Sequence, residues 1–136
     1  MGFLDDVVVP VQKKVAAQGY SSLSEAERTV FCVAELEAEV NKGGFHKYFS
    51  NASGDHVLEA IESLRRIGAV QTSRIVEKAC MLFPQGRPDP DRTRRQQQLE
   101  TFELDFEAFE ALDSAFLAYR EDREKLQAKY WASKHS

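Results

Sequence analysis

The sequence predicts an all-α fold, built as one compact domain (residues 1–136) of about six helices. Apolar residues recur every three or four positions along most of the chain, which is the spacing that gives a helix one buried face. No segment alternates consistently between apolar and polar residues, as a half-buried strand would. Residues 91–136 contain neither glycine nor proline, the two residues that most disfavour a helix. A chain of 136 residues is long enough for one domain with its own core.

The first 22 residues are a lead-in with the weakest pattern. Pro10 suits the first turn of a short helix over residues 10–17. The three valines at positions 7–9 fit either a short strand or the beginning of that helix. We therefore expect a short irregular segment at the start of the chain.

Two helices are expected after the lead-in. Ser24 and Glu27 have the spacing of a capping box. The helix that they begin is expected to end at Gly43 and Gly44, because glycine readily takes the left-handed conformation that closes a helix. Asp55 is the expected N-cap of the second helix, whose apolar residues recur at helical spacing to residue 67.

The second half of the chain predicts three or four more helices. One ends at Pro84 and is expected to form a hairpin with the helix before it. Asp89 and Pro90 fit the N-cap and first position of the next helix. Beyond them we expect two or three helices, with breaks near residues 101–105 and near Arg120. Their apolar stripe is Leu99, Phe102, Phe106, Phe109 and Phe116.

The net charge of −4 is unevenly distributed. Counting Asp and Glu against Lys and Arg, residues 1–40 carry seven against three, residues 41–98 six against ten, and residues 99–136 nine against five. The three blocks therefore carry −4, +4 and −4. The basic block includes an arginine cluster at positions 87–95, but aspartates interleave with it and the chain is acidic overall. Direct binding of nucleic acid is not expected; Arg94 and Arg95 should flank a helix and pair with carboxylates.

Four glutamates would line one helical face of the last block. They are Glu100, Glu103, Glu107 and Glu110. No Lys or Arg stands between residues 99 and 113 to pair with them along the same helix. The face is either the solvated side of an amphipathic helix or an acidic surface that docks a basic partner.

Residues for catalysis or metal binding are sparse. His46 and His56 have only Asp55 nearby, whereas a metal site needs at least three converging ligands, so no metal or other cofactor is expected. Ser50, His46 and Asp55 could be drawn as a catalytic triad, but no glycine-flanked serine supports it. The glycine pair lacks the Lys-Ser/Thr of a phosphate-binding loop.

Two further features concern the cell compartment. Cys32 and Cys80 sit among apolar residues in helical segments, without the spacing of a disulfide framework or a zinc site. We interpret both as reduced core residues of a cytoplasmic protein. No uninterrupted apolar stretch approaches the length that crosses a membrane, so no membrane association is expected.

Residues 39–55 form the most distinctive stretch of the sequence. Phe45, Tyr48 and Phe49 are spaced so that one helical turn after the glycine pair would place all three rings in the core. Asn41 and Asn51 would satisfy backbone groups of a tight connection. The local roles of these residues are therefore mainly structural.

The same stretch resembles the signature of a bacterial family, the DNA-mimic protein nineteen-like family. The likeness runs from about residue 23 to residue 131. The matching motif positions are Asn41, Gly43, Gly44, Phe45, Tyr48, Phe49, Asn51, Gly54 and Asp55. Lys42 stands where an asparagine is common, and Lys47 where a glutamine is usual, so both departures add positive charge to the motif.

The resemblance implies an acidic, all-helical homodimer that imitates the phosphates of duplex DNA and occupies the DNA-binding face of a transcription factor. Glu100 to Glu110 spans about 15 Å of helix and places four charges there, where duplex DNA carries about nine. Dimerisation, or Glu35 and Glu39 joining the surface, could raise this density, whereas the basic middle block opposes it.

Three functions stay open on the sequence. We expect a non-catalytic domain that binds a protein partner, either as a DNA mimic bound to a DNA-binding protein or as a less specific interaction module. The alternative is a small-molecule-binding or enzymatic domain that uses the region Phe45–Asp55. A cleft formed by the aromatic motif residues would favour the alternative.

Overall fold

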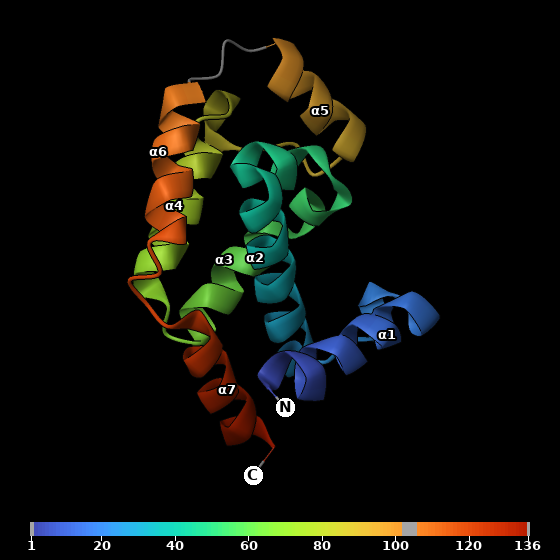
Figure 1. The fold of residues 1–136 in the computed structure, drawn as a ribbon. Coiled ribbons are helices and arrows are strands. Elements are labelled where there is room, and N and C mark those ends of the chain that lie inside the picture. The colour runs from blue at the N-terminus through green and yellow to red at the C-terminus, as the bar shows by residue number, and fades with distance from the viewer. Residues whose placement is uncertain (1, 102–105, 136) are drawn as a thin grey trace.

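The longest helix, α2, runs through the middle of the molecule, and the other helices pack around it (Figure 1). The computed structural model describes residues 2–101 and 106–135, and within them every regular element is helical. Short 3₁₀ or π segments are labelled η. The elements are, in order, η1 (Leu4–Val8), α1 (Val9–Gln18), η2 (Tyr20–Ser22), α2 (Glu25–Ser50), η3 (Ala52–His56), α3 (Val57–Arg66), α4 (Val70–Met81), η4 (Pro84–Gly86), α5 (Arg92–Thr101), α6 (Phe106–Leu117) and α7 (Arg123–Lys134). The predicted all-α class is confirmed.

The lead-in is helical from Leu4 onward. Pro10 lies in the first turn of α1, as predicted, because proline needs no hydrogen-bond partner for its nitrogen there. The three valines at positions 7–9 belong to η1 and α1, so of the two conformations open to them the helical one is found. Val11 packs in a second apolar cluster with Leu23 and Val30, which joins the lead-in to α2.

The capping box at the start of α2 is confirmed. The Ser24 amide donates to Glu27 Oε1 at 2.9 Å, and the Glu27 amide donates to Ser24 Oγ at 3.2 Å. The far end of the predicted helix differs from expectation. Gly43 (φ −160°) and Gly44 (φ 74°) leave the helical conformation, but the chain resumes it at once. The glycine pair therefore bends α2, which ends only at Ser50.

The core lies between the bent part of α2 and the helices that follow it. Phe45, Tyr48 and Phe49 are 0% exposed, which confirms the prediction that all three rings are buried. Phe49 meets Phe83 edge-on with ring centroids 4.8 Å apart, and Phe45 meets Phe116 edge-on at 5.7 Å. Such edge-to-face pairs are a favoured geometry of buried aromatic rings.

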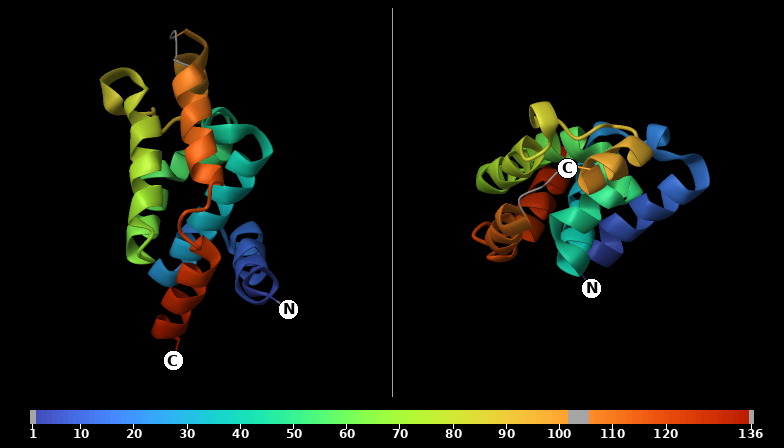
Figure 2. Two further views of the ribbon diagram at one scale, coloured as in Figure 1. Left: turned by 60° about the vertical axis from the view of Figure 1, so that its left-hand side comes forward. Right: turned by 90° about the horizontal axis from the view of Figure 1, so that it is seen from above.

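The predicted break near Arg120 lies between α6 and α7, whereas residues 102–105 of the other predicted break lie outside the described residues. α6 lies beside α4, as both views in Figure 2 show, and it also contacts α2. α7 turns back toward the beginning of the chain, so both ends of the described chain lie at the same end of the molecule (Figure 1). There Trp131 of α7 joins the apolar cluster of the lead-in. None of the described helices combines the length and apolar character needed to cross a membrane.

Candidate functional site

The bend in α2 depends on a carboxylate from α6. The Phe45 amide, free at the start of the second part of α2, donates to Asp113 Oδ1 at 2.8 Å. The Asp113 carboxylate lies against Gly44, where a Cβ would come within 2.8 Å of Asp113 Cγ. Burial raises the pKa of Asp113, and the bond from Phe45 opposes part of that rise. Gly44 thus supplies both a left-handed conformation and room for this cap.

A buried arginine organises the other end of the motif. Arg95 of α5 is 0% exposed, and all five of its N–H groups have acceptors. Its Nε donates to Phe49 O at 2.6 Å, and its two terminal nitrogens donate to Asp89 O (3.0 Å), Pro90 O (3.2 Å), Asn51 O (2.8 Å) and Asp55 Oδ1 (2.8 Å). The expectation that Arg95 pairs with a carboxylate is confirmed, but its burial and four carbonyl partners were not foreseen.

This arrangement corrects the predicted role of Asp55. The residue at the N-cap of α3 is His56, which makes no side-chain cap bond, and Asp55 instead pairs with Arg95. Gly54 gives the guanidinium its space, because a Cβ there would lie 2.8 Å from Arg95 Nε. The predicted cap at Asp89 is also displaced: Asp91 Oδ2 accepts the Arg94 amide at 3.0 Å, and α5 begins at Arg92.

The side chains of the two motif asparagines form hydrogen bonds with other side chains, not only with backbone groups. Asn51 Nδ2 donates to Glu39 Oε2 at 2.8 Å, and its backbone carbonyl accepts from Arg95. Asn41, which is exposed, accepts from the Tyr119 hydroxyl at 3.2 Å. Tyr119 follows α6, so this bond adds a second tie between the bend and the C-terminal third.

His56 and Asp55 have partners that the sequence did not reveal. His56 Nδ1 lies 3.0 Å from Glu35 Oε1, and its ring stacks on Tyr20 with centroids 4.1 Å apart. The bond to Glu35 raises the pKa of His56, against the opposing effect of burial. His46 is exposed, and Asp55 is committed to Arg95. In residues 2–101 and 106–135, no three His, Cys, Asp or Glu side chains are grouped as metal ligands.

Both cysteines are buried, as predicted. Cys32 is 0% exposed and Cys80 6% exposed, and the two are free thiols. Burial raises the pKa of each thiol to about 12, so neither is a ready nucleophile near neutral pH.

The predicted acidic face does not form on one helix. Glu100 belongs to α5, whereas Glu107 and Glu110 belong to α6, and all three are exposed. Glu103 lies outside the described residues. The described glutamates therefore do not share one helical face, because α5 and α6 point in different directions (Figure 1).

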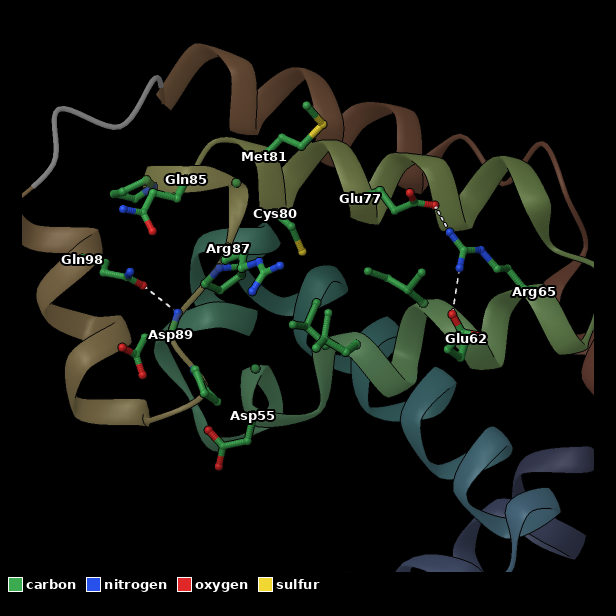
Figure 3. A pocket seen from close by; sticks show the side chains of 18 residues that line it. Asp55, Glu62, Arg65, Glu77, Cys80, Met81, Gln85, Arg87, Asp89 and Gln98 are labelled. Atoms are coloured by element: carbon green, nitrogen blue, oxygen red, sulfur yellow. Dashed lines mark hydrogen bonds and ion pairs between the residues drawn. The ribbon is translucent and has the colours of Figure 1, made fainter.

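A groove of about 1030 Å³ lies between α3, α4 and the η4 loop (Figure 3). Leu58 (73% exposed) and Met81 (71% exposed) line it and are the two most exposed large apolar side chains described. At one end Arg65 is held by Glu62 and Glu77, each at 2.7 Å. Of the motif, Gly54 and Asp55 line this groove; the three buried rings do not.

A second hollow, of about 310 Å³, lies where η1, α2 and α7 meet. We call it the acidic hollow. Its apolar walls are Phe3, Leu4, Val8, Ala34 and Ala38, and its polar lining is Glu37, Asn41, Glu124 and Gln127. No Lys or Arg among the described residues lines it. Burial raises the pKa of Glu37, neighbouring Glu124 and Asp122 reinforce the rise, and Arg123 opposes it.

Sequence reasoning missed this hollow because its residues come from three remote segments. Asp5 and Asp6 are exposed on η1, and Asp122 and Glu124 are exposed on and before α7. The charge count does place an acidic block at each end of the sequence. The missing information was that α7 returns to the lead-in.

Comparison with known proteins supports the resemblance seen in the sequence. The family model described as DMP19-like protein matches residues 21–135. No curated protein and no solved structure matches the chain.

Proposed function

Because the chain belongs to the DMP19-like protein family, we propose that it is a non-catalytic protein-interaction domain that binds a DNA-binding protein, with its carboxylates in the place of DNA phosphates. The observation that carries the proposal is the set of exposed carboxylates on η1 and at the start of α7, two segments that line the acidic hollow. They are Asp5, Asp6, Asp122 and Glu124. Fold alone does not transfer a function, so the charge arrangement is the argument.

Three arginines of the basic block oppose this function little, because they are paired. Arg66 pairs with Glu59, Arg65 pairs with Glu62 and Glu77, and Arg95 pairs with Asp55. These cations are therefore neutralised within the molecule. By contrast, Asp5, Asp6 and Glu124 have no ion pair in the part of the chain that the structure describes. Their charge is available to a basic surface.

Affinity capture from the native cell extract tests the proposal. The immobilised chain should retain a DNA-binding protein at low salt and release it as salt rises, because screening weakens contacts between exposed charges. The variant Asp5→Asn, Asp6→Asn, Glu124→Gln should lose the captured protein. The matched variant Glu25→Gln, Glu62→Gln, Glu77→Gln removes as many charges from α2, α3 and α4 and should keep it. Retention that does not respond to salt, or equal loss with both variants, would refute the assignment.

The groove favours a second candidate function, the binding of an anionic amphipathic small molecule. Its volume is that of a ligand pocket, and Leu58 and Met81 offer an apolar surface to water. Arg87 is exposed at the groove, with no ion pair in the described residues. An aromatic sulfonate dye should then bind the folded chain saturably and lose affinity in Met81→Glu. Dye binding that is absent, or unchanged by that substitution, would remove this candidate.

A further inference from the structure

We propose that the acidic hollow receives a single lysine or arginine side chain of the bound protein. The inference rests on the proposed function, and it names the group that the acidic end recognises. It follows from three features of the hollow: its size and walls, its unused acceptor, and the sign of its charge.

The size and walls of the hollow suit one long side chain. A volume of about 310 Å³ is at the lower end for ligand pockets, too small for a drug-sized molecule to be enclosed. Phe3, Leu4, Val8, Ala34 and Ala38 form apolar walls. Lysine and arginine carry methylene stems that pack on apolar surface while the cationic head reaches polar groups.

The unused acceptor is the side-chain carbonyl of Gln127. This side chain is 5% exposed and lines the hollow, and its Oε1 has no hydrogen-bond partner in the described structure. Buried polar atoms are nearly always paired in folded proteins, and an unpaired one is costly. A hydrogen-bond donor bound in the hollow would satisfy this acceptor, and ammonium and guanidinium groups each carry several donors.

The charge of the hollow selects a cationic donor. Glu37 and Glu124 lie in the lining beside Gln127, so a bound cation meets two carboxylates and a carbonyl. Arg123 pairs with Glu37, with its Nε 3.3 Å from Glu37 Oε1, whereas Glu124 has no ion pair among the described residues. An exposed Asp122 adds negative charge at the start of α7.

The competing occupant is a water molecule. Arg123 lies one helical turn before Gln127, is 2% exposed, and has an unpaired Nη2. A resident water could accept from Arg123 and donate to Gln127. The experiment must therefore separate a site that binds a cation from one that holds only water.

Titration of the isotopically labelled protein with small cations makes this separation by NMR. Agmatine and butylamine carry a guanidinium and an ammonium on a short apolar stem. Each should give saturable changes in chemical shift that are confined to residues of the hollow, including the Gln127 side-chain amide. Tetramethylammonium has the same charge but no N–H group, and it should shift these signals at least about tenfold more weakly. Equal responses to all three cations, or no saturable response to agmatine and butylamine, would overturn the proposal in favour of a general charge effect or a resident water.

Two variants locate the binding. Glu124→Gln keeps the shape of the hollow and removes one carboxylate. It should weaken the binding of agmatine about tenfold. Ala38→Trp fills the hollow from α2 and should abolish the saturable shifts. Glu62→Gln, an exposed acid of α3, is the matched control and should bind agmatine normally. Unchanged affinity in Glu124→Gln would contradict the proposal even if Ala38→Trp fails to fold.

The titration needs no partner, so it is independent of the proposed function. If no DNA-binding protein is captured, the proposed function fails while the titration still decides whether the hollow binds the cation. If a protein is captured, its retention should fall at least about tenfold in Glu124→Gln and stay unchanged in Glu62→Gln. Unchanged retention in Glu124→Gln would exclude the hollow as the receptor for that protein.

Discussion

Gly44 shows how one residue can serve conformation and packing together. Its φ of 74° is in the region that favours glycine, and the Asp113 carboxylate fills the space that a Cβ would need. Gly68 has a similar φ of 88°, but no atom lies within 4 Å of the position of its Cβ. Substitutions at the two positions can therefore be compared: both strain the backbone, but only one at Gly44 displaces the Asp113 cap.

We predict that Gly44→Ala destabilises the protein more than Gly68→Ala. Each substitution carries about 1–2 kcal/mol of backbone strain, and overpacking against Asp113 adds roughly 1–3 kcal/mol at position 44. Urea unfolding of both variants measures the difference. Adding Asp113→Ala to Gly44→Ala should remove much of the excess, since the double-mutant cycle isolates their contact. Equal costs for the two glycine variants would show that the contact is unimportant.

His56 predicts a dependence of stability on pH. Its pKa is raised in the folded protein by the bond to Glu35, so the folded state holds the proton more tightly than the unfolded chain. The stabilisation that protonated His56 gives the folded state is fully present below the pKa of the residue in the unfolded chain, about 6.5. It is lost as pH rises through the pKa of His56 in the folded protein. His56→Gln should thus lower the free energy of unfolding more at pH 5.5 than at pH 9. If His56→Gln lowers the free energy of unfolding equally at both pH values, the bond between His56 and Glu35 would be refuted.

Among the elements, α5 depends on a tie that its own sequence does not reveal. Its charged, glutamine-rich segment has little apolar surface, yet Arg95 fixes it to the end of α2 and to η3 through three hydrogen bonds. Breaking such a buried cluster leaves carbonyl groups without donors. Arg94, the preceding residue, is exposed and makes no ion pair among the described residues.

We therefore predict that Arg95→Met costs about 3 kcal/mol or more of unfolding free energy. Arg94→Met, the matched control on the same helix, should change it by less than about 0.5 kcal/mol. Amide hydrogen exchange should also accelerate in the η4 loop and α5 of Arg95→Met, because the tie to α2 is gone. Comparable effects of the two substitutions would contradict the assigned role of Arg95.

Local signals in the sequence predicted the elements well where the partners are close along the chain. The capping box of Ser24 and Glu27 acts over three residues, and Pro10 acts within its own turn. Remote partners at other helix ends could not be predicted. Asp113 caps Phe45 from 68 residues away, and Glu121 receives the Thr72 amide at the start of α4 from 49 residues away. No helical period encodes such pairs.

The candidate sites were predicted less well than the fold for the same reason. The aromatic motif could be placed in the core because its spacing shows one buried face. Asp55 was assigned to a cap because its partner, Arg95, lies 40 residues away on another helix. The acidic hollow needs residues from both ends of the chain, so only the packing of α7 against the lead-in reveals it.

At the scale of the whole molecule, the fold pairs some charges and leaves others exposed. Arg65, Arg66 and Arg95 of the middle block pair with carboxylates. Exposed carboxylates remain on η1 and at the start of α7, the segments that line the acidic hollow. A surface of this kind attracts a basic partner over the distance of the screening length. It would occupy that partner in place of DNA.

Competition with duplex DNA tests this central claim most directly. The captured protein is purified and bound to a fluorescently labelled duplex, and the chain is then added while the anisotropy of the DNA is followed. We predict that the chain displaces the duplex, and that raising salt weakens both complexes because both rest on charge. Formation of a ternary complex, with the DNA still bound at saturating chain, would contradict the account.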